Sequence, residues 1–240
     1  MRCLIIAAGR GSRLAGRFPL KPLAPLAGTP LIERVMALAA GEGLREFVVV
    51  GGYRFPELAR FVREAASRLG VDAEMVENPD WRLENGLSLL AARPVLGHDF
   101  VVLMSDHIFD GGLLAVAMAA PVREGQAALV VDYRVSDHPT ADLEDVTKVR
   151  VRDGRIADIG KNLSLYNAFD TGIFRGTAGL LAALEESRRG GDGSLSGGMR
   201  VLARRGEALA LDGGGRFWID VDDERAFALA EEIVARGAAL

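Results

Sequence analysis

Short apolar segments alternate with amphipathic ones over the first 131 residues of the chain. The apolar segments are almost continuous in Val, Ile, Leu and Ala, a pattern typical of strands buried on both faces. Their alternation with helical patterns predicts an α/β fold, with a Rossmann-like mixed, mostly parallel sheet between helices. The expected strands are Cys3–Ala8, Phe47–Val50, Ala73–Val76, Phe100–Met104 and Ala127–Val131, and the expected helices lie near 30–41, 56–69, 86–93 and 111–119.

The pattern of the chain changes after residue 140. Segments at Val146–Val151 and Ile156–Ile159 flank Asp153 and Gly154, and a central Asp-Gly pair is a strong signal for a tight hairpin turn. We therefore expect a small antiparallel insertion over about 140–165. Phe169–Phe174 then reads as a return to the main sheet.

Length and composition indicate one large domain. The chain has 240 residues, of which 49% are hydrophobic, so a single domain over 1–240 is expected. The net charge of −4 and the lack of a basic cluster with interleaved aromatic residues argue against nucleic acid as a partner. The apolar stretch Leu113–Val122 is interrupted by Pro121 and is about half the roughly 20 residues that a membrane span needs, so no membrane insertion is expected.

Two further features concern location and mobility. The chain has one cysteine, Cys3, which cannot form an intrachain disulfide. With no secretion signal in the N-terminal apolar run, this predicts a reducing, cytoplasmic location. The stretch Arg188 to Gly198 is rich in Gly, Ser and Arg and predicts a mobile loop.

The first strand leads into a loop of small residues that is followed by two cations, Arg13 and Lys21. Small residues let backbone N–H groups approach a nucleotide closely, and the two cations supply positive charge for its phosphates. The spacing is neither G-x-G-x-x-G nor G-x-x-x-x-G-K-[ST], which excludes those dinucleotide and P-loop signatures. The small residues of interest are Ala7, Ala8, Gly9, Gly11 and Ser12.

Three carboxylates are candidates for a metal site. Asp106 follows the fourth expected strand, at the edge where ligands gather in open α/β sheets. Asp220 and Asp222 are two residues apart, which in an extended segment puts both side chains on one face. Hard oxygen ligands of this kind suit Mg²⁺. The rival interpretations are loop capping by Asp106 and capping of a helix at 224–235, the latter fitting Asp223 best.

His107 directly follows the first of these carboxylates. A phosphomonoester acceptor is already ionised near neutral pH, since its second pKa is about 6, so no general base is needed to activate it. We therefore expect His107 to bind the acceptor or to make a structural hydrogen bond. His98 and His138 are expected to be solvated or capping residues, and hydrolytic and zinc mechanisms have no supporting spacing.

The opening loop, followed by Lys21-Pro22-Leu23, resembles the signature of nucleotidyltransferases that join an NTP to a phosphorylated acceptor. The resemblance implies that the loop wraps the triphosphate and that Arg13 and Lys21 contact its phosphates. It also implies that the backbone at Ala7, Ala8 and Gly9 meets the base. Leu20 stands where the family usually has a proline before the lysine.

Later segments resemble CTP:inositol-1-phosphate cytidylyltransferases in their order along nearly the whole chain. The residues that carry this resemblance lie in Glu84–Leu90, Met104–His107, Val146–Ile156, Ile159–Leu163, Asp170–Gly172 and Trp218–Asp222. It implies that Lys148 and Lys161 bind the acceptor phosphate and that Asp170 and Thr171 bind its hydroxyls, with Gly172 leaving room. Asp106, with Asp220 or Asp222, would hold the metal.

The residues themselves leave alternatives open. Asn85 and Ser88 can read the polar edge of a pyrimidine, with Gly86 allowing close approach, or Asn85-Gly86 can be only a turn before a helix. Lys148 and Lys161 can be solvated strand ends. Trp218 fits core packing better than base stacking, because Phe217 and Ile219 beside it are also apolar.

These observations favour a Mg²⁺-dependent cytidylyl transfer from CTP to inositol 1-phosphate, by direct in-line attack that expels pyrophosphate. The expected partners are CTP and a small phosphorylated acceptor, and we allow for a homodimer. Because the chain has no spanning segment, a separate membrane phosphotransferase would use the product. The rivals are transfer to another small phosphate and a catalytically silent nucleotide-binding module on the same fold.

Overall fold

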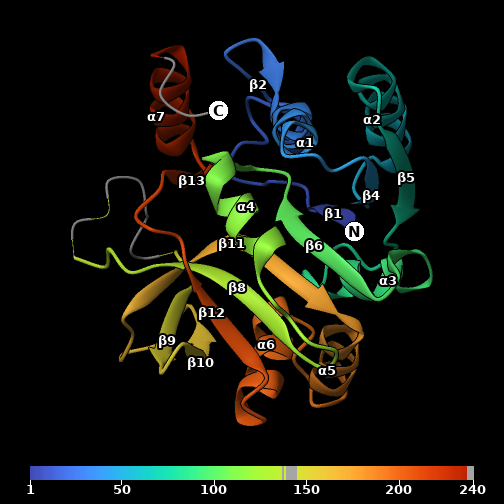
Figure 1. The fold of residues 1–240 in the computed structure, drawn as a ribbon. Coiled ribbons are helices and arrows are strands. Elements are labelled where there is room, and N and C mark those ends of the chain that lie inside the picture. The colour runs from blue at the N-terminus through green and yellow to red at the C-terminus, as the bar shows by residue number, and fades with distance from the viewer. Residues whose placement is uncertain (137, 139–144, 237–240) are drawn as a thin grey trace.

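β1 (Arg2–Ala7) is the central strand of a parallel group that builds one half of the sheet (Figure 1). The computed structural model describes residues 1–136, 138 and 145–236. β1 pairs in parallel with β4 (Glu46–Gly51) and β6 (Asp99–Met104), and β5 (Asp72–Glu77) extends the group beyond β4. In the order β5-β4-β1-β6 the chain crosses from one side of β1 to the other, so a ligand crevice is expected at the carboxyl ends of β1 and β6.

The other half of the sheet is mainly antiparallel. β11 (Ala168–Thr177) enters between β6 and β8 (Ala127–Asp132) and runs antiparallel to both. β12 (Ala208–Asp212) then pairs in parallel with β8. The sheet is mixed, as expected, but it has less parallel pairing than the alternation of segments predicted, because β11 runs against its neighbours.

The predicted hairpin is confirmed. β9 (Lys148–Arg152) and β10 (Arg155–Gly160) pair antiparallel around Asp153 and Gly154, both of which have positive φ. β9 also pairs with β11 and β10 with β12, so in the described residues the hairpin completes a nine-stranded sheet. Residues 140–144 of the expected insertion lie outside the described residues.

Alternate side chains of the sheet enter two different apolar layers. Leu4 faces one layer, while Cys3 and Ile5 face the other, as the two-residue period of a strand requires. The first layer contains α3 (Gly86–Leu96), α5 (Ala178–Arg189) and α6 (Leu195–Arg204), and the second contains α1 (Leu31–Gly41), α2 (Phe55–Leu69) and α4 (Gly111–Ala119). No helix of the described residues has the length and apolar character needed to cross a membrane.

A third, smaller core joins the first loop to the C-terminal part of the chain. It packs Leu14 and Leu26 against Phe227 of α7 (Glu224–Ala235). Asp223 caps this helix as predicted, because its Oδ1 accepts a hydrogen bond of 2.7 Å from the backbone N–H of Ala226. The short elements nearby are the 3₁₀ turn Lys21–Leu23, the pair β2 (Pro25–Leu26) and β3 (Thr29–Pro30), and the pair β7 (His107–Phe109) and β13 (Trp218–Asp220).

The prediction of a loop over 188–198 is wrong, because most of these residues belong to α5, to α6 or to a tight connection between them. Asp192 Oδ1 accepts hydrogen bonds from the backbone N–H of Ser194 at 3.0 Å and from its hydroxyl at 2.6 Å. Gly198 allows close packing of α6 on α5, since a Cβ there would lie 2.7 Å from a methyl carbon of Leu184.

Candidate active site

Lys21 is the buried cation at the centre of the site. Its side chain crosses the first loop at Gly11, where a Cβ would lie 2.4 Å from the Cβ of Lys21. Gly11 also has a φ of 65°, so both the space and the backbone conformation require glycine there. The loop therefore folds closely over the lysine, which is only 5% exposed in its side chain.

Three carboxylates face this lysine. Lys21 Nζ lies 2.7 Å from Asp106 Oδ2 and 4.0 Å from Asp220 Oδ1, and it also pairs with Asp222. Burial alone would lower the pKa of Lys21, but the three carboxylates raise it overall. The lysine therefore carries its positive charge at neutral pH.

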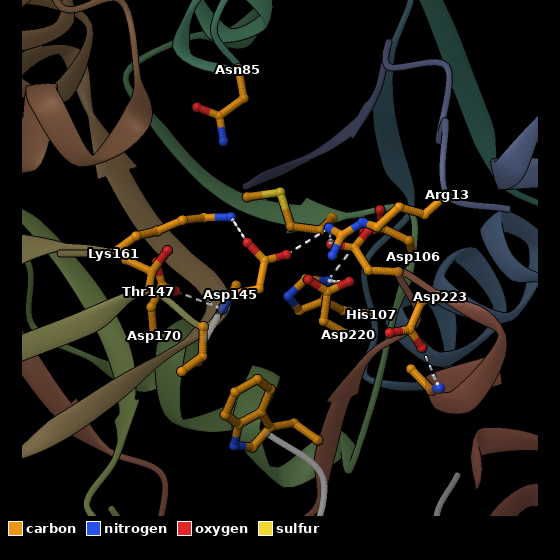
Figure 2. Close-up of a pocket in the computed structure, with 16 residues that line it drawn as sticks. Arg13, Asn85, Asp106, His107, Asp145, Thr147, Lys161, Asp170, Asp220 and Asp223 are labelled. Atoms are coloured by element: carbon orange, nitrogen blue, oxygen red, sulfur yellow. Dashed lines mark hydrogen bonds and ion pairs between the residues drawn. The ribbon is translucent and has the colours of Figure 1, made fainter. Parts of the chain in front are cut away.

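Asp106 and Asp220 come together because β7 pairs with β13. In that pairing Asp220 lies opposite His107, and the backbone N–H of Val221 donates to the carbonyl of Asp106 at 3.0 Å. His107 Nδ1 is 3.1 Å from Asp106 Oδ1 and 3.7 Å from Asp220 Oδ1 (Figure 2). Residues that are far apart in the sequence thus share one small volume.

The charges at this cluster favour a divalent cation. One donor atom from each of Asp106, His107 and Asp220 lies within 4.8 Å of the others. Among the described residues, Asp220 Oδ1 is a buried oxygen without a hydrogen-bond partner. Burial, reinforced by the carboxylates of Asp106 and Asp222, raises the pKa of Asp220 to about 7. The two carboxylates therefore supply oxygen ligands that fit a divalent metal, while His107, whose pKa is lowered by burial but raised overall to about 9 by Asp220 and Asp106, carries a proton at neutral pH in this arrangement.

Asp222 differs from Asp220 in its partners. Its two oxygens pair with Lys21 and with Arg13, so its negative charge is already balanced by two cations. The sequence alone did not distinguish Asp220 from Asp222 as the metal ligand. Among the described residues Asp220 Oδ1 accepts no hydrogen bond, so Asp220 is the freer of the two aspartates to bind a metal.

Asp145 joins two cations that lie on opposite sides of the site. Its Oδ2 lies 2.6 Å from Arg13 Nη2, and its Oδ1 pairs with Lys161 (Figure 2). These contacts border a cavity of about 260 Å³. The residues that line it include Arg13, Asn85, Asp106, His107, Asp145, Thr147, Lys161, Asp170, Gly172, Trp218, Asp220, Asp222 and Asp223.

On the expected acceptor side, Asp170 lines the cavity and Thr171 does not. Asp170 Oδ1 accepts a hydrogen bond of 2.7 Å from the N–H of Gly172, and burial raises the pKa of its carboxyl to about 6. Thr171 is fully buried and donates to the carbonyl of Val130 at 2.8 Å. Thr171 therefore cannot bind acceptor hydroxyls as expected, because strand alternation turns its side chain into the core.

The two lysines predicted to bind the acceptor phosphate differ in their position relative to the cavity. Lys161 lines the cavity, but Lys148 is not among its lining residues. Lys148 Nζ instead donates to the backbone carbonyl of Lys161 at 2.8 Å and lies over the ring of Tyr166. The structure thus brings Lys161 to the site directly and Lys148 only through the backbone of Lys161.

On the expected nucleotide side, Asn85 lines the cavity, while Ser88 and Gly86 do not. Ser88 is 1% exposed, and its hydroxyl accepts a hydrogen bond of 3.2 Å from the amide of Asn78. A Cβ at Gly86 would lie 2.4 Å from the carbonyl oxygen of Gly193, so this glycine makes room for the start of α6 and not for a base. Asn85 Oδ1 accepts from the backbone N–H of Leu195 at 2.9 Å, which fixes the asparagine to the same helix.

The first loop lines a second cavity of about 270 Å³ beside the first. Asn85, Asp106 and Asp222 border both cavities, so the two are neighbours. Ser12 is exposed and lines neither of them. The other predicted loop residues, Ala7, Ala8, Gly9 and Gly11, line the second cavity together with Lys21.

Sequence reasoning missed Asp145 and misjudged His138. Asp145 had no motif signal, because only the fold brings it between Arg13 and Lys161. The His138 side chain is fully buried, with Nε2 2.9 Å from Asp132 Oδ2, so the expectation of a solvated or capping residue is wrong. His98 is exposed, as expected.

The sequence is similar to those of known proteins. Residues 3–159 match the family described as MobA-like NTP transferase domain. The bifunctional IPC transferase and DIPP synthase of Rubrobacter xylanophilus is 37% identical over 238 residues, which is 98% of this chain and 52% of that protein. The protein of the same name from Thermococcus kodakarensis is 32% identical over 240 residues, which is 99% of this chain and 51% of that protein. The chain thus spans about half the length of these relatives.

The fold is also similar to solved structures. The inositol-1-phosphate CTP transferase from T. maritima superposes with a TM-score of 0.85 at 25% identity, over 100% of this chain and 98% of that one. The mixed sheet flanked by helices is therefore the fold of nucleotide-diphospho-sugar transferases, as the sequence predicted.

Proposed function

Because the chain belongs to the family of MobA-like NTP transferases, we propose that it transfers the cytidylyl group of CTP to inositol 1-phosphate and releases pyrophosphate. The observation that carries the proposal is one cavity where Arg13 and Lys161 lie beside the pair Asp106 and Asp220. Such a site offers cations for two phosphorylated substrates and carboxylates for a metal. The names of the relatives and of the T. maritima structure support CTP and inositol 1-phosphate.

In this proposal Asp106 and Asp220 hold Mg²⁺, with His107 beside them. Asp220 Oδ1 supports this assignment, because a buried polar atom without a hydrogen bond is costly and the cations near it are not in hydrogen-bond contact, at 3.7 Å for His107 Nδ1 and 4.0 Å for Lys21 Nζ. When bound, Mg²⁺ would neutralise the negative charge of α-phosphate oxygens. Lys21 stays protonated next to the same carboxylates and adds fixed positive charge.

The acceptor phosphate needs no general base, because it is already largely ionised at neutral pH. Lys161 would orient it, while Arg13 and Lys21 bind the triphosphate. An acceptor oxygen forms a bond to the α-phosphorus, and the bond from that phosphorus to the bridging oxygen of the β-phosphate breaks. Pyrophosphate leaves with the electron pair, and no covalent enzyme intermediate is required. Catalysis is then mainly positioning and electrostatic stabilisation.

Substrate phosphates would replace carboxylates as partners of the cations. Asp145 now occupies both Arg13 and Lys161, and Asp222 occupies Arg13 and Lys21. Phosphate oxygens form charge-assisted hydrogen bonds of the same kind. The backbone of Ala7, Ala8 and Gly9 would meet the nucleotide, and Asp170 would accept hydrogen bonds from acceptor hydroxyls.

The test is a substrate panel. Pyrophosphate release is measured with each of the four NTPs against inositol 1-phosphate, choline phosphate, aminoethylphosphonate and sugar 1-phosphates, with and without Mg²⁺. Metal-dependent release with CTP and inositol 1-phosphate is the expected result. Release with another acceptor would replace the substrate and keep the reaction type, while no release with any pair would contradict the proposal.

A further inference from the structure

Asp132 is a buried carboxylate at the end of β8 that has no part in the proposed reaction. Its side chain is 2% exposed. Oδ1 accepts from the backbone N–H of Arg134 at 2.9 Å, and Oδ2 accepts from Arg134 Nη2 at 2.6 Å. Oδ2 also lies 2.9 Å from His138 Nε2 and 2.9 Å from Trp218 Nε1. One carboxylate thus contacts three side chains, two from the segment that follows β8 and one from β13.

The bond to Trp218 has a fixed direction. An indole N–H can only donate, and an ionised carboxylate can only accept. Trp218 is 2% exposed and lines the cavity, so its buried N–H needs an acceptor at this position. An apolar residue at 132 would fill the space but would leave the orientation of the indole ring unspecified.

The hydrogen bond between Asp132 and Trp218 is linked through β13 to Asp220, the proposed metal ligand. Trp218 and Asp220 are two residues apart in β13, so their side chains lie on the same face of that strand. The backbone before β13 is also tied to β8, because the N–H of Gly213 donates to the carbonyl of Val131 at 2.9 Å. Arg134 Nη2 donates to the carbonyl of Arg216 at 2.8 Å. Contacts of Asp132 and of the end of β8 thus hold Trp218 and the segment before β13, in addition to the pairing of β13 with β7.

We propose that Asp132 is a positioning residue for Asp220: through the indole of Trp218 it fixes β13, and with it the carboxylate that faces Asp106. The inference rests on the proposed function, because it assumes that Asp106 and Asp220 hold a divalent metal. A buried partner that orients a metal ligand typically changes metal affinity or activity by 10- to 100-fold when it is substituted. Asp132 does not contact the metal ligand itself; it orients Asp220 indirectly, through Trp218 and strand β13.

The decisive substitution is Asp132→Asn. The asparagine amide is neutral and has only one oxygen, so its NH₂ group faces N–H donors in either orientation: those of Arg134 if it takes the place of Oδ1, or those of Trp218 and Arg134 if it takes the place of Oδ2. Binding of Mn²⁺ to the 240-residue chain is measured from the loss of the free-ion electron paramagnetic resonance signal. The temperature is kept well below the unfolding midpoint of each variant. We expect the Kd for Mn²⁺ to rise about 10-fold.

Two further variants separate positioning from general destabilisation. Trp218→Phe removes the N–H donor and leaves the Asp132 carboxylate in place, so it should also weaken Mn²⁺ binding. The variant that carries both Asp132→Asn and Trp218→Phe should then bind Mn²⁺ only a little more weakly than either single variant. Asp99→Asn is the matched control, because Asp99 forms a bidentate pair with Arg175 at the start of β6, away from the site. It should leave the Kd unchanged.

The outcomes are distinguishable. If the unsubstituted chain binds no Mn²⁺, the proposed metal site fails, and the inference fails with it. If the chain binds Mn²⁺ and Asp132→Asn and Trp218→Phe bind it equally well, only the inference is overturned. If Asp132→Asn does not fold, Trp218→Phe decides alone, with weaker binding in support and unchanged binding against. Weakening by Asp99→Asn to the same degree would likewise count against positioning through Trp218.

Discussion

The imidazole of His107 packs on the backbone of Gly172. A Cβ added at residue 172 would lie 2.5 Å from Cδ2 of His107 and 2.7 Å from its Nε2. Gly172 also has a φ of 78°, which side chains other than that of glycine disfavour. Resemblance had suggested that this glycine leaves room for the acceptor, but the space is filled by the histidine. β11 is thereby joined to the cluster of Asp106, His107 and Asp220.

Gly172→Ala should therefore displace His107 and lower the transfer rate. A shift of about 1 Å in a site group can cost on the order of 100-fold. The control is Gly154→Ala in the hairpin, where φ is 70° but a Cβ would meet nothing within 4 Å. Both variants should lose about 1–2 kcal/mol of unfolding free energy through backbone strain. Steady-state rates should fall only for Gly172→Ala, and equal rates would disprove the role of the contact.

Lys161→Ala should raise the KM for the acceptor more than Lys148→Ala does. Lys161 lines the cavity, whereas Lys148 donates to a backbone carbonyl. A hydrogen bond to a charged group contributes about 1.5–3 kcal/mol, so the KM should rise by about 10-fold or more for Lys161→Ala. Initial rates at varied acceptor concentration measure this. Equal effects of the two substitutions would contradict the separation of the lysines.

Ser88→Ala should reduce stability but change the KM for CTP little. Its hydroxyl is buried against the amide of Asn78, and losing it leaves that amide unpaired at a cost of about 1–3 kcal/mol. Asn85→Ala, in contrast, removes a side chain that lines both cavities and should raise the KM for CTP. Denaturant unfolding and initial rates together test the pair. A larger effect of Ser88→Ala on the KM for CTP would restore the original expectation.

Asp132 should make the fold sensitive to acid. Burial alone would raise the pKa of its carboxyl, but the hydrogen bonds from His138, Arg134 and Trp218 lower it well below its ordinary value. A depressed folded-state pKa contributes stability above the unfolded pKa of about 4, and this contribution is lost as pH falls further. The difference in melting temperature between the wild type and Asp132→Asn should therefore be largest at neutral pH and narrow progressively as the pH falls below about 4. A constant difference between them would contradict this.

Much of the sheet could be predicted because burial on both faces leaves a plain signal. The strand segments around Leu4, Val48 and Val102 are continuous runs of apolar residues, and the Asp153-Gly154 turn defines the hairpin. The connection before α6 was mistaken for a mobile loop, since the sequence does not show that Gly198 packs on Leu184. The Gly- and Ser-rich composition of this stretch indicates flexibility, but close packing against α5 gives it a defined structure.

The site residues that could be predicted are those whose place follows from their position after a strand in the sequence. Arg13, Lys21 and Asp106 follow strand ends, and the geometry brings them together. Thr171 and Ser88 were assigned by position in a motif, but their side chains point into the core. Asp145 was missed because its importance comes from two partners far away in the sequence.

The most direct test of the proposed reaction follows the α-phosphorus of CTP. The chain is incubated with inositol 1-phosphate, Mg²⁺ and CTP labelled with ³²P at either the α or the γ position. The proposal predicts that label from the α position enters a new product containing inositol, while label from the γ position appears only in pyrophosphate. Transfer of the γ label to the acceptor, or no labelled product from α-labelled CTP, would contradict cytidylyl transfer.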